Sequence, residues 1–184
     1  MKRKDISLLT LCACMLALAT ILSFIKIFEL SFGGTVTLCS MVPILYLALN
    51  YPFRWVFITS TAYGLIQMMA SFYPPPAGTF AAYAADVLLD YVIAFGVLGL
   101  AGVFSKPFKG TSGPIIGAAL AIICRFLCHF LSGILVWKVY APEGQPVFLY
   151  SLVYNGSYMS IELIISLTAL LFINGFMRRR NNRT

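Results

Sequence analysis

The chain has few charged residues and a single histidine. Only 10% of its 184 residues are charged, whereas 60% are hydrophobic. A soluble domain has about 25% charged and roughly half apolar residues, so this composition excludes an ordinary soluble protein. The mean hydropathy of +0.90 is typical of an integral membrane protein.

Recognisable catalytic motifs are also lacking. The sequence has no Ser/His/Asp grouping, no HExxH motif, no glycine-rich phosphate loop and no GxGD aspartate pair. A membrane-spanning helix needs about 20 apolar residues, so such helices fill the chain and leave no room for a soluble ATPase domain. We therefore expect a protein that is not an enzyme. The absence of an internal repeat argues against a self-sufficient secondary transporter.

Apolar segments separated by turn-rich or charged connectors predict an all-α membrane protein with six transmembrane helices. All six belong to a single integral membrane domain, residues 1–184. The expected spans are residues 6–27, 36–50, 53–72, 80–104, 115–139 and 147–177. The second span is shorter than a bilayer requires, so we expect either that protein surrounds it or that it is embedded unevenly in the membrane.

Most cations fall on one side of these predicted spans. On the side of both termini lie Lys2, Arg3, Lys4, Arg54, Lys106, Lys109, Arg178, Arg179, Arg180 and Arg183. Only Lys26 and Lys138 fall on the other side. Because cytoplasmic loops are enriched in Lys and Arg, both termini are expected in the cytoplasm. The basic residues behind the net charge of +7 therefore set the membrane topology and contact the lipid bilayer. We do not expect them to bind nucleic acid.

The cysteines raise the question of a metal site. All five lie in apolar segments, and Cys124 and Cys128 share a helix face beside His129. Structural zinc sites normally use two closely spaced ligand pairs, and no second pair is visible. We therefore interpret the cysteines as small buried hydrophobic residues and expect no metal.

Several polar and aromatic side chains are expected at similar depths in the outer half of the membrane. Helix rise brings Asp90, Tyr91, His129 and Asn155 to one level, with Trp137 and Tyr150 nearer the outer surface. A carboxylate, aromatic faces and directional hydrogen-bonding groups suit a small, flat, partly cationic ligand. The sequence therefore predicts a pocket that opens outward.

The charged residues in these spans also have a purely structural interpretation. Asp86 and Asp90 could each pair with Arg125 and only hold helices together, because intramembrane charges often pair. Glu162 lies close enough in depth to Arg125 for a buried ion pair.

The aromatic residues and the histidine have structural interpretations as well. Trp137, Tyr140 and Tyr150 could belong to the aromatic belt at the membrane interface. His129 could be a packed histidine whose hydrogen bonds are satisfied within the protein.

Three stretches of the sequence carry a family resemblance. They are LDY at residues 89–91, HFLSGILVW at 129–137 and YSLVYNG at 150–156, and their joint spacing is far more specific than any one motif. The pair Ala13 and Ala17 and the segment MVPIL at 41–45 agree with them. Over most of its length the chain resembles the thiamine-specific substrate-binding (S) components of energy-coupling factor (ECF) vitamin transporters.

The resemblance implies an S-component fold with an outward-facing thiamine pocket, thiamine being the transported ligand and not a cofactor. It implies that Asp90 engages the aminopyrimidine ring. The other matching residues would stack on the vitamin, hydrogen-bond to it or leave room for it: Tyr91, His129, Gly133, Trp137, Tyr150 and Asn155. Ala13 and Ala17 would dock a transmembrane coupling subunit in a prokaryotic plasma membrane, and two cytoplasmic ATPase subunits would drive uptake.

Two positions depart from the family pattern. Some members have Glu where this chain has the shorter Asp90. Some also place a lid tryptophan in the first outer loop, where this chain reads Ser31, Phe32, Gly33 and Gly34. Either Phe32 or the Gly33–Gly34 loop is expected to replace that lid.

Two other functions remain open from the sequence. The chain could be an S component for another heteroaromatic vitamin or precursor. It could also be a structural membrane protein whose polar residues only tie helices together.

Overall fold

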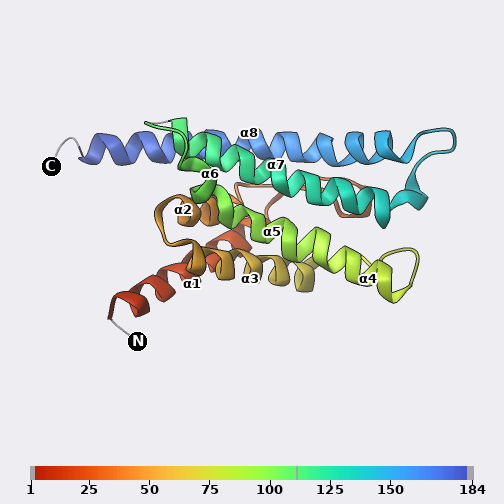
Figure 1. Ribbon diagram of the computed structural model, residues 1–184, viewed down its shortest axis with the longest axis horizontal. Coiled ribbons are helices and arrows are strands. Elements are labelled where there is room, and N and C mark those ends of the chain that lie inside the picture. The colour runs from red at the N-terminus through yellow and green to blue at the C-terminus, as the bar shows by residue number, and fades with distance from the viewer. Residues whose placement is uncertain (1–2, 111, 182–184) are drawn as a thin grey trace.

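The computed structural model describes residues 3–110 and 112–181, which form helices and one small β-hairpin (Figure 1). The separate helices are α1 (Arg3–Ser23), α2 (Val42–Asn50), α3 (Phe53–Ser71), α7 (Ser112–Leu135) and α8 (Val147–Asn181). A further, uninterrupted helical unit consists of α4 (Phe80–Asp86), the π-helical η2 (Val87–Ile93), α5 (Ala94–Gly96), η3 (Val97–Leu100) and α6 (Ala101–Ser105). A short turn, η4 (Lys138–Tyr140), follows α7.

Four of these helical units are long and apolar enough to cross a membrane. They are α1, the unit Phe80–Ser105, α7 and the Val147–Gly175 part of α8. The second predicted span is shorter than expected, because α2 begins at Val42 and not at residue 36. Pro43 in its first turn suits a helix start, since that position needs no backbone donor. The expectation that protein surrounds this short helix is confirmed, since Ile44 and Leu45 have no exposed surface.

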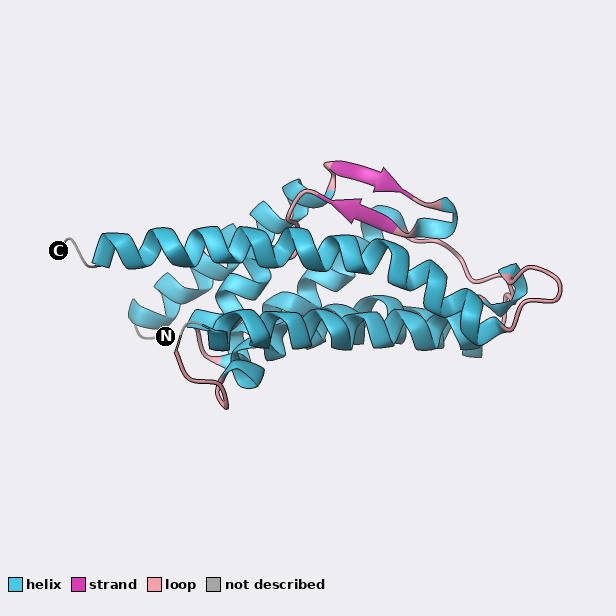
Figure 2. Cartoon of the chain, turned by 90° about the horizontal axis from the view of Figure 1, so that it is seen from above, coloured by secondary structure: helices cyan, strands magenta, loops and turns pink. Residues whose placement is uncertain are grey.

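The segment between α1 and α2 adds a small β-hairpin to the expected all-α fold. Strands β1 (Lys26–Glu29) and β2 (Thr35–Thr37) pair antiparallel, with Glu29 opposite Thr35, and the turn η1 (Ser31–Gly33) connects them (Figure 2). Gly33 has a φ of 96°, which glycine adopts without the steric penalty that a side chain brings. β1 replaces the end of the first predicted span, and β2 replaces the start of the second.

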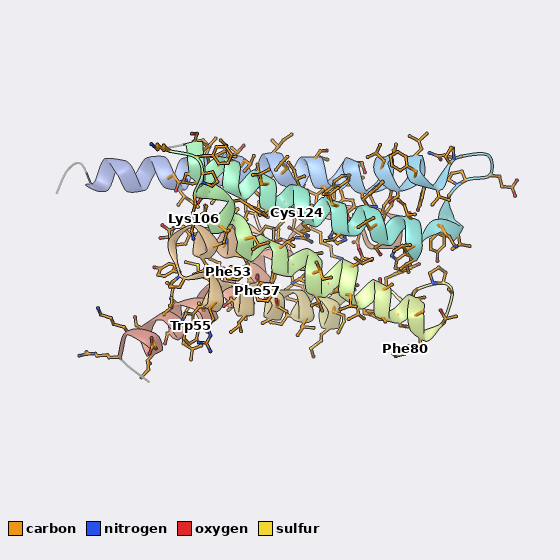
Figure 3. The ribbon with its side chains drawn as sticks, in the orientation of Figure 1. Phe53, Trp55, Phe57, Phe80, Lys106 and Cys124 are labelled. Carbon is orange, nitrogen blue, oxygen red and sulfur yellow. The ribbon has the colours of Figure 1, made fainter. Side chains whose placement is uncertain are left out.

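The helices give the molecule two distinct ends. The start of α1 and the end of α8 lie at the same end (Figure 1). The connector after α6, which carries Lys106, lies at that end too (Figure 3). The side chains of residues 176–181 and all of Lys2 and Arg183 lie outside the described part of the chain. Large apolar side chains cover the outer faces, and Phe80 at the start of α4 is 89% exposed (Figure 3). Such a surface suits contact with lipid.

A close approach between α6 and α2 generates a stability prediction. A Cβ atom at Gly102 would lie 1.9 Å from the carbonyl oxygen of Ala48, so the two backbones require glycine at this contact. We expect Gly102→Ala to destabilise the protein by about 1–3 kcal/mol, as overpacking does. Thermal unfolding in detergent measures this effect. Gly175→Ala is the matched control, because a Cβ there meets nothing within 4 Å. Equal melting temperatures for both variants would contradict the prediction.

Candidate ligand-binding cavity

A cavity of about 510 Å³ lies between the β-hairpin, the end of α3, η2, α7 and α8. The residues predicted for the pocket all line it: Asp90, Tyr91, His129, Gly133, Trp137, Tyr150 and Asn155. Gly33 and Gly34 of the predicted lid line it as well, whereas the side chain of Phe32 lies outside the described part of the structure. The structure therefore brings together side chains from segments far apart in the sequence.

Asp90 is held by three donors from the end of α7 and the turn after it. Its Oδ1 lies 2.7 Å from Nδ1 of His129. Its Oδ2 accepts hydrogen bonds from Oγ of Ser132 and, at 3.1 Å, from Nε1 of Trp137. Asp90 itself belongs to the π-helical segment η2, and such segments occur frequently at functional sites. These bonds join the fourth helical unit to α7.

The contacts of His129 assign its tautomer. Nε of Arg125 donates to Nε2 of His129 at 3.2 Å, and a guanidinium can only donate. Nε2 is therefore unprotonated, so Nδ1 carries the proton and donates to Asp90. Both ring nitrogens are thus bonded within the protein, as the structural interpretation of this histidine expected, yet the ring also lines the cavity.

Arg125 does not pair directly with Asp86, Asp90 or Glu162 in the contacts of the described residues. Its guanidinium carbon lies 4.0 Å from the centre of the Phe95 ring, in a cation–π contact. The expectation of a Glu162 pair with Arg125 is wrong, and so is a direct pair between Arg125 and either aspartate. Arg125 is instead linked to Asp90 indirectly, because it hydrogen-bonds to His129 and His129 hydrogen-bonds to Asp90.

Glu162 bonds to the β-hairpin. Its Oε1 accepts hydrogen bonds from the backbone N of Thr37 at 2.5 Å and from Oγ1 of the same residue at 2.7 Å. The glutamate is 4% exposed and lines the cavity. The hydrogen-bond partner of Glu162 is Thr37 and not the predicted Arg125, because β2 packs against α8. Helix rise alone does not predict this contact.

The tip of the hairpin is also held by α8. The hydroxyl of Tyr154 donates to the backbone oxygen of Ser31 and accepts from the backbone N of Gly34 at 3.0 Å. Sequence reasoning missed this tyrosine and its neighbour Tyr158, although both line the cavity. The sequence does contain a pattern that indicates them, because Tyr150, Tyr154, Tyr158 and Glu162 follow one another at intervals of four residues. That spacing places them on one helix face.

Gly133 and Asn155 lie where α7 contacts α8. A Cβ at Gly133 would come within 2.1 Å of Oγ of Ser151, so the glycine makes room first of all for α8. The amide nitrogen of Asn155 donates to the backbone oxygens of Ser151 and His129, and its oxygen accepts from the hydroxyl of Tyr158. Both residues line the cavity, but their described contacts hold its walls together.

Aromatic rings surround the outer part of the cavity. Trp137 stacks on Tyr140, with 6.1 Å between the ring centres, and lies 5.6 Å from the ring of Tyr73. Because its indole N–H bonds to Asp90, Trp137 is turned toward the cavity and not only toward the membrane interface. Tyr150 stacks on Tyr154 along α8. The cavity thus has flat aromatic surfaces on two sides.

The charges that line the cavity favour a cation. The acidic lining residues are Glu29, Asp86, Asp90 and Glu162, and the basic ones are Lys26 and Arg125. Lys26 and Glu29 pair with each other at 2.8 Å. Acidic side chains therefore outnumber the lysine and arginine side chains in the lining. Aromatic faces beside an excess of carboxylates suit a flat, positively charged ligand.

The predicted docking pair lies away from this cavity. Ala13 and Ala17 are both exposed on α1, four residues apart and therefore on one face. Small exposed side chains of this kind let another helix approach closely.

A family profile and two relatives that match this chain are all described as thiamine transporters. The family profile described as "Thiamine transporter protein (Thia_YuaJ)" matches residues 9–181. The thiamine transporter ThiT of Bacillus subtilis (strain 168) is 30% identical over 165 residues, which cover 83% of this chain and 82% of the relative. ThiT of Lacticaseibacillus paracasei is 30% identical over 93 residues, which cover 45% of this chain and 46% of the relative.

A solved structure shows the same fold. The structure of ThiT from Listeria monocytogenes matches with a TM-score of 0.76 and 22% identity, covering 96% of this chain and 98% of that one. The expected S-component fold is therefore confirmed, and the residues that the structure describes add a β-hairpin to the helices. The chain is a multi-pass membrane protein, and it belongs to the thiamine transporter family.

Proposed function

We propose that this chain is the thiamine-binding S component of an ECF-type transporter. It binds the vitamin from outside a prokaryotic plasma membrane, with both termini in the cytoplasm, and separate partner subunits hydrolyse ATP. The chain itself performs no catalysis. The proposal rests above all on the anchored carboxylate of Asp90 between aromatic surfaces, in a cavity where acidic groups outnumber basic ones.

The chemistry of thiamine matches these features. Its thiazolium ring carries a fixed positive charge, which aromatic faces and nearby carboxylates attract. Its aminopyrimidine ring offers hydrogen-bond donors and acceptors in one plane. Asp90 supplies the negative charge for this ring, and Tyr91, His129 and Asn155 border it. Trp137 and Tyr150 stack on the vitamin, and Gly133 allows the two helices that frame it to meet.

The β-hairpin is proposed as the lid. Gly33 and Gly34 line the cavity, and hydrogen bonds from Tyr154 and Glu162 hold the hairpin on α8 at two points. Those two residues are eight positions apart, about 12 Å along the helix, so the hairpin lies over the cavity as a strap. The glycines let its backbone approach the ligand without a side chain in between.

The first prediction from this proposed function concerns Trp137, one of two tryptophans in the chain. Titration of the detergent-purified protein with thiamine is expected to quench tryptophan fluorescence in a saturable way. Trp137→Phe should abolish most of the quench and weaken binding by about 3- to 30-fold, because a cation–π contact contributes roughly 0.5–2 kcal/mol. Calorimetry on the same samples measures the affinity.

The control for this titration is Trp55→Phe, since Trp55 on α3 does not line the cavity (Figure 3). This variant should keep both the quench and the affinity. A folded wild-type protein that binds no thiamine would overturn the proposal and direct the search to other heteroaromatic vitamins.

The second prediction concerns the lid. Tyr154→Phe removes the hydroxyl that bonds to Ser31 and Gly34, so the hairpin should open more often. We expect faster hydrogen exchange at the amides of residues 31–37 and a thiamine dissociation rate raised by about 3- to 10-fold, because one or two hydrogen bonds are lost. Tyr83→Phe, at a tyrosine outside the cavity lining, serves as the control. Unchanged exchange and dissociation in the Tyr154 variant would refute the lid.

The coupling subunit is proposed to dock on the exposed face of α1 that carries Ala13 and Ala17. Both residues are exposed, whereas Cys12 and Ala19 of the same helix are buried against the rest of the chain. A helix that presents small residues on its lipid side can be approached closely by a partner helix. ATP-driven release toward the cytoplasm would act through this contact.

The third prediction follows from that face. Ala13→Trp with Ala17→Trp should abolish co-purification with the coupling subunit while leaving thiamine affinity within about twofold, because the face is remote from the cavity and tryptophan blocks close helix packing. Leu18→Trp, at an exposed α1 position that is large already and lies about 100° around the helix from Ala17, is the control. Retained co-purification of the alanine variant would exclude this docking face.

A further inference from the structure

The polar side chains around the cavity differ in how many hydrogen-bonding atoms they have left for a ligand. Asp90 accepts from three protein donors, and both ring nitrogens of His129 are bonded to protein atoms. The amide of Asn155 donates to the backbone of α7 and of α8 and accepts from Tyr158. These residues therefore fix the cavity walls, and a ligand has to compete with their present partners.

Arg125 on α7 has hydrogen-bond donors left. A guanidinium carries five N–H groups, and the described residues accept from one of them, the Nε–H that bonds to His129 at 3.2 Å. The terminal nitrogens, Nη1 and Nη2, have no hydrogen-bond partner in the described part of the chain, yet neither is fully enclosed by protein as Oδ2 of Asp86 is. Because Arg125 lines the cavity and is only partly buried, these nitrogens keep surface that a ligand can contact.

The guanidinium of Arg125 is also held in position. Its central carbon lies 4.0 Å from the centre of the Phe95 ring, and its Nε–H is fixed by His129. A planar guanidinium that is already positioned loses little conformational freedom when it donates further hydrogen bonds. Arg125 is therefore prepared to bind an acceptor in the cavity.

The position of Arg125 determines which part of thiamine it can contact. It precedes His129 by one helical turn, about 6 Å toward the inner end of the cavity, whereas Trp137 follows the opposite end of α7. A guanidinium only donates, so its partner must carry a lone pair. The pyrimidine nitrogens of thiamine carry one, and the alkylated thiazolium nitrogen does not. The aminopyrimidine ring is therefore the part that suits the inner end.

We propose that Arg125 is a further ligand-binding residue, whose Nη atoms donate to a ring nitrogen of the bound aminopyrimidine. The inference rests on the proposed function and refines it. Asp90 supplies negative charge beside the ring, and Arg125 requires an acceptor at its inner edge. The thiazolium ring is thereby directed outward, toward Trp137 and Tyr150. A flat ligand without such an acceptor binds poorly, because it covers the free donors of Arg125 without bonding to them.

A purely structural role of Arg125 has a different consequence. If Arg125 only held His129 in place, its loss would weaken all ligands that depend on the bonded pair of His129 and Asp90 to a similar extent. The ring atoms of the ligand would not matter. The ratio of the affinities for two ligands that differ only in their ring nitrogens therefore separates the two roles.

The experiment measures this ratio by calorimetry on the full-length protein in detergent. Thiamine is compared with its aminophenyl analogue, in which CH groups replace both pyrimidine nitrogens while the amino group and the thiazolium ring are kept. Wild type should bind thiamine more tightly. Arg125→Met should reduce this preference by about 10- to 100-fold, because a hydrogen bond from a charged donor is lost for thiamine alone.

The matched control is Lys26→Met. Lys26 is a cation that also lines the cavity, but it is paired with Glu29 at 2.8 Å. This variant should keep the wild-type preference for thiamine over the aminophenyl analogue. A loss of preference in both variants would point to the overall charge of the cavity and refute a specific role of Arg125.

The remaining outcomes distinguish this inference from the proposed function. If folded wild type binds neither ligand, the proposed function fails and the inference falls with it. If wild type binds thiamine but does not prefer it, or if Arg125→Met weakens both ligands equally, the role of Arg125 is overturned. If the variant does not fold, a crystal structure of the wild-type complex decides. A pyrimidine nitrogen within about 3.2 Å of Nη1 or Nη2 supports the role, and a ring with no nitrogen in that range refutes it.

Discussion

A carboxylate inside a membrane-spanning helix is stable only when polar partners surround it. Asp90 has such partners in His129, Ser132 and Trp137, and Arg125 extends the chain of hydrogen bonds behind the histidine. All four residues lie on α7 or directly after it, so the hydrogen bonds that stabilise the charge of Asp90 also hold the fourth helical unit against α7. The cavity exists where these two helical units and α8 meet.

The π-helical segment η2 and the β-hairpin give this cavity its particular walls. η2 carries both Asp90 and Tyr91, and it follows directly on Asp86. The hairpin closes the remaining side of the cavity, because Tyr154 and Glu162, at two positions along α8, hydrogen-bond to its backbone. Thus one side of the cavity is a rigid helical contact, whereas the side formed by the hairpin is held by a few hydrogen bonds and is the part suited to open and close.

Much of the candidate site followed from reading depth along predicted helices. Asp90 and His129 were placed at one level because helix rise is constant, and in the structure they are bonded to each other. The partner of Glu162 was predicted wrongly, because depth alone allowed Arg125 while the fold presents Thr37 of the hairpin. Tyr154 and Tyr158 were missed although their spacing of four residues was visible, since tyrosines in an apolar helix resemble ordinary packing.

The sequence by itself determined that the chain enters a membrane, where most of its helices run and which family it belongs to, because hydropathy, helix rise and motif spacing are local properties of the chain. Only the tertiary structure decided that residues 26–37 form a hairpin, that Arg125 bonds to His129, and that three donors from the end of α7 and the turn after it hold Asp90. The physical reason is that lipid accepts apolar side chains on every outer face. Hydrophobic periodicity therefore does not tell which face of a helix turns inward, and packing between helices has to decide it.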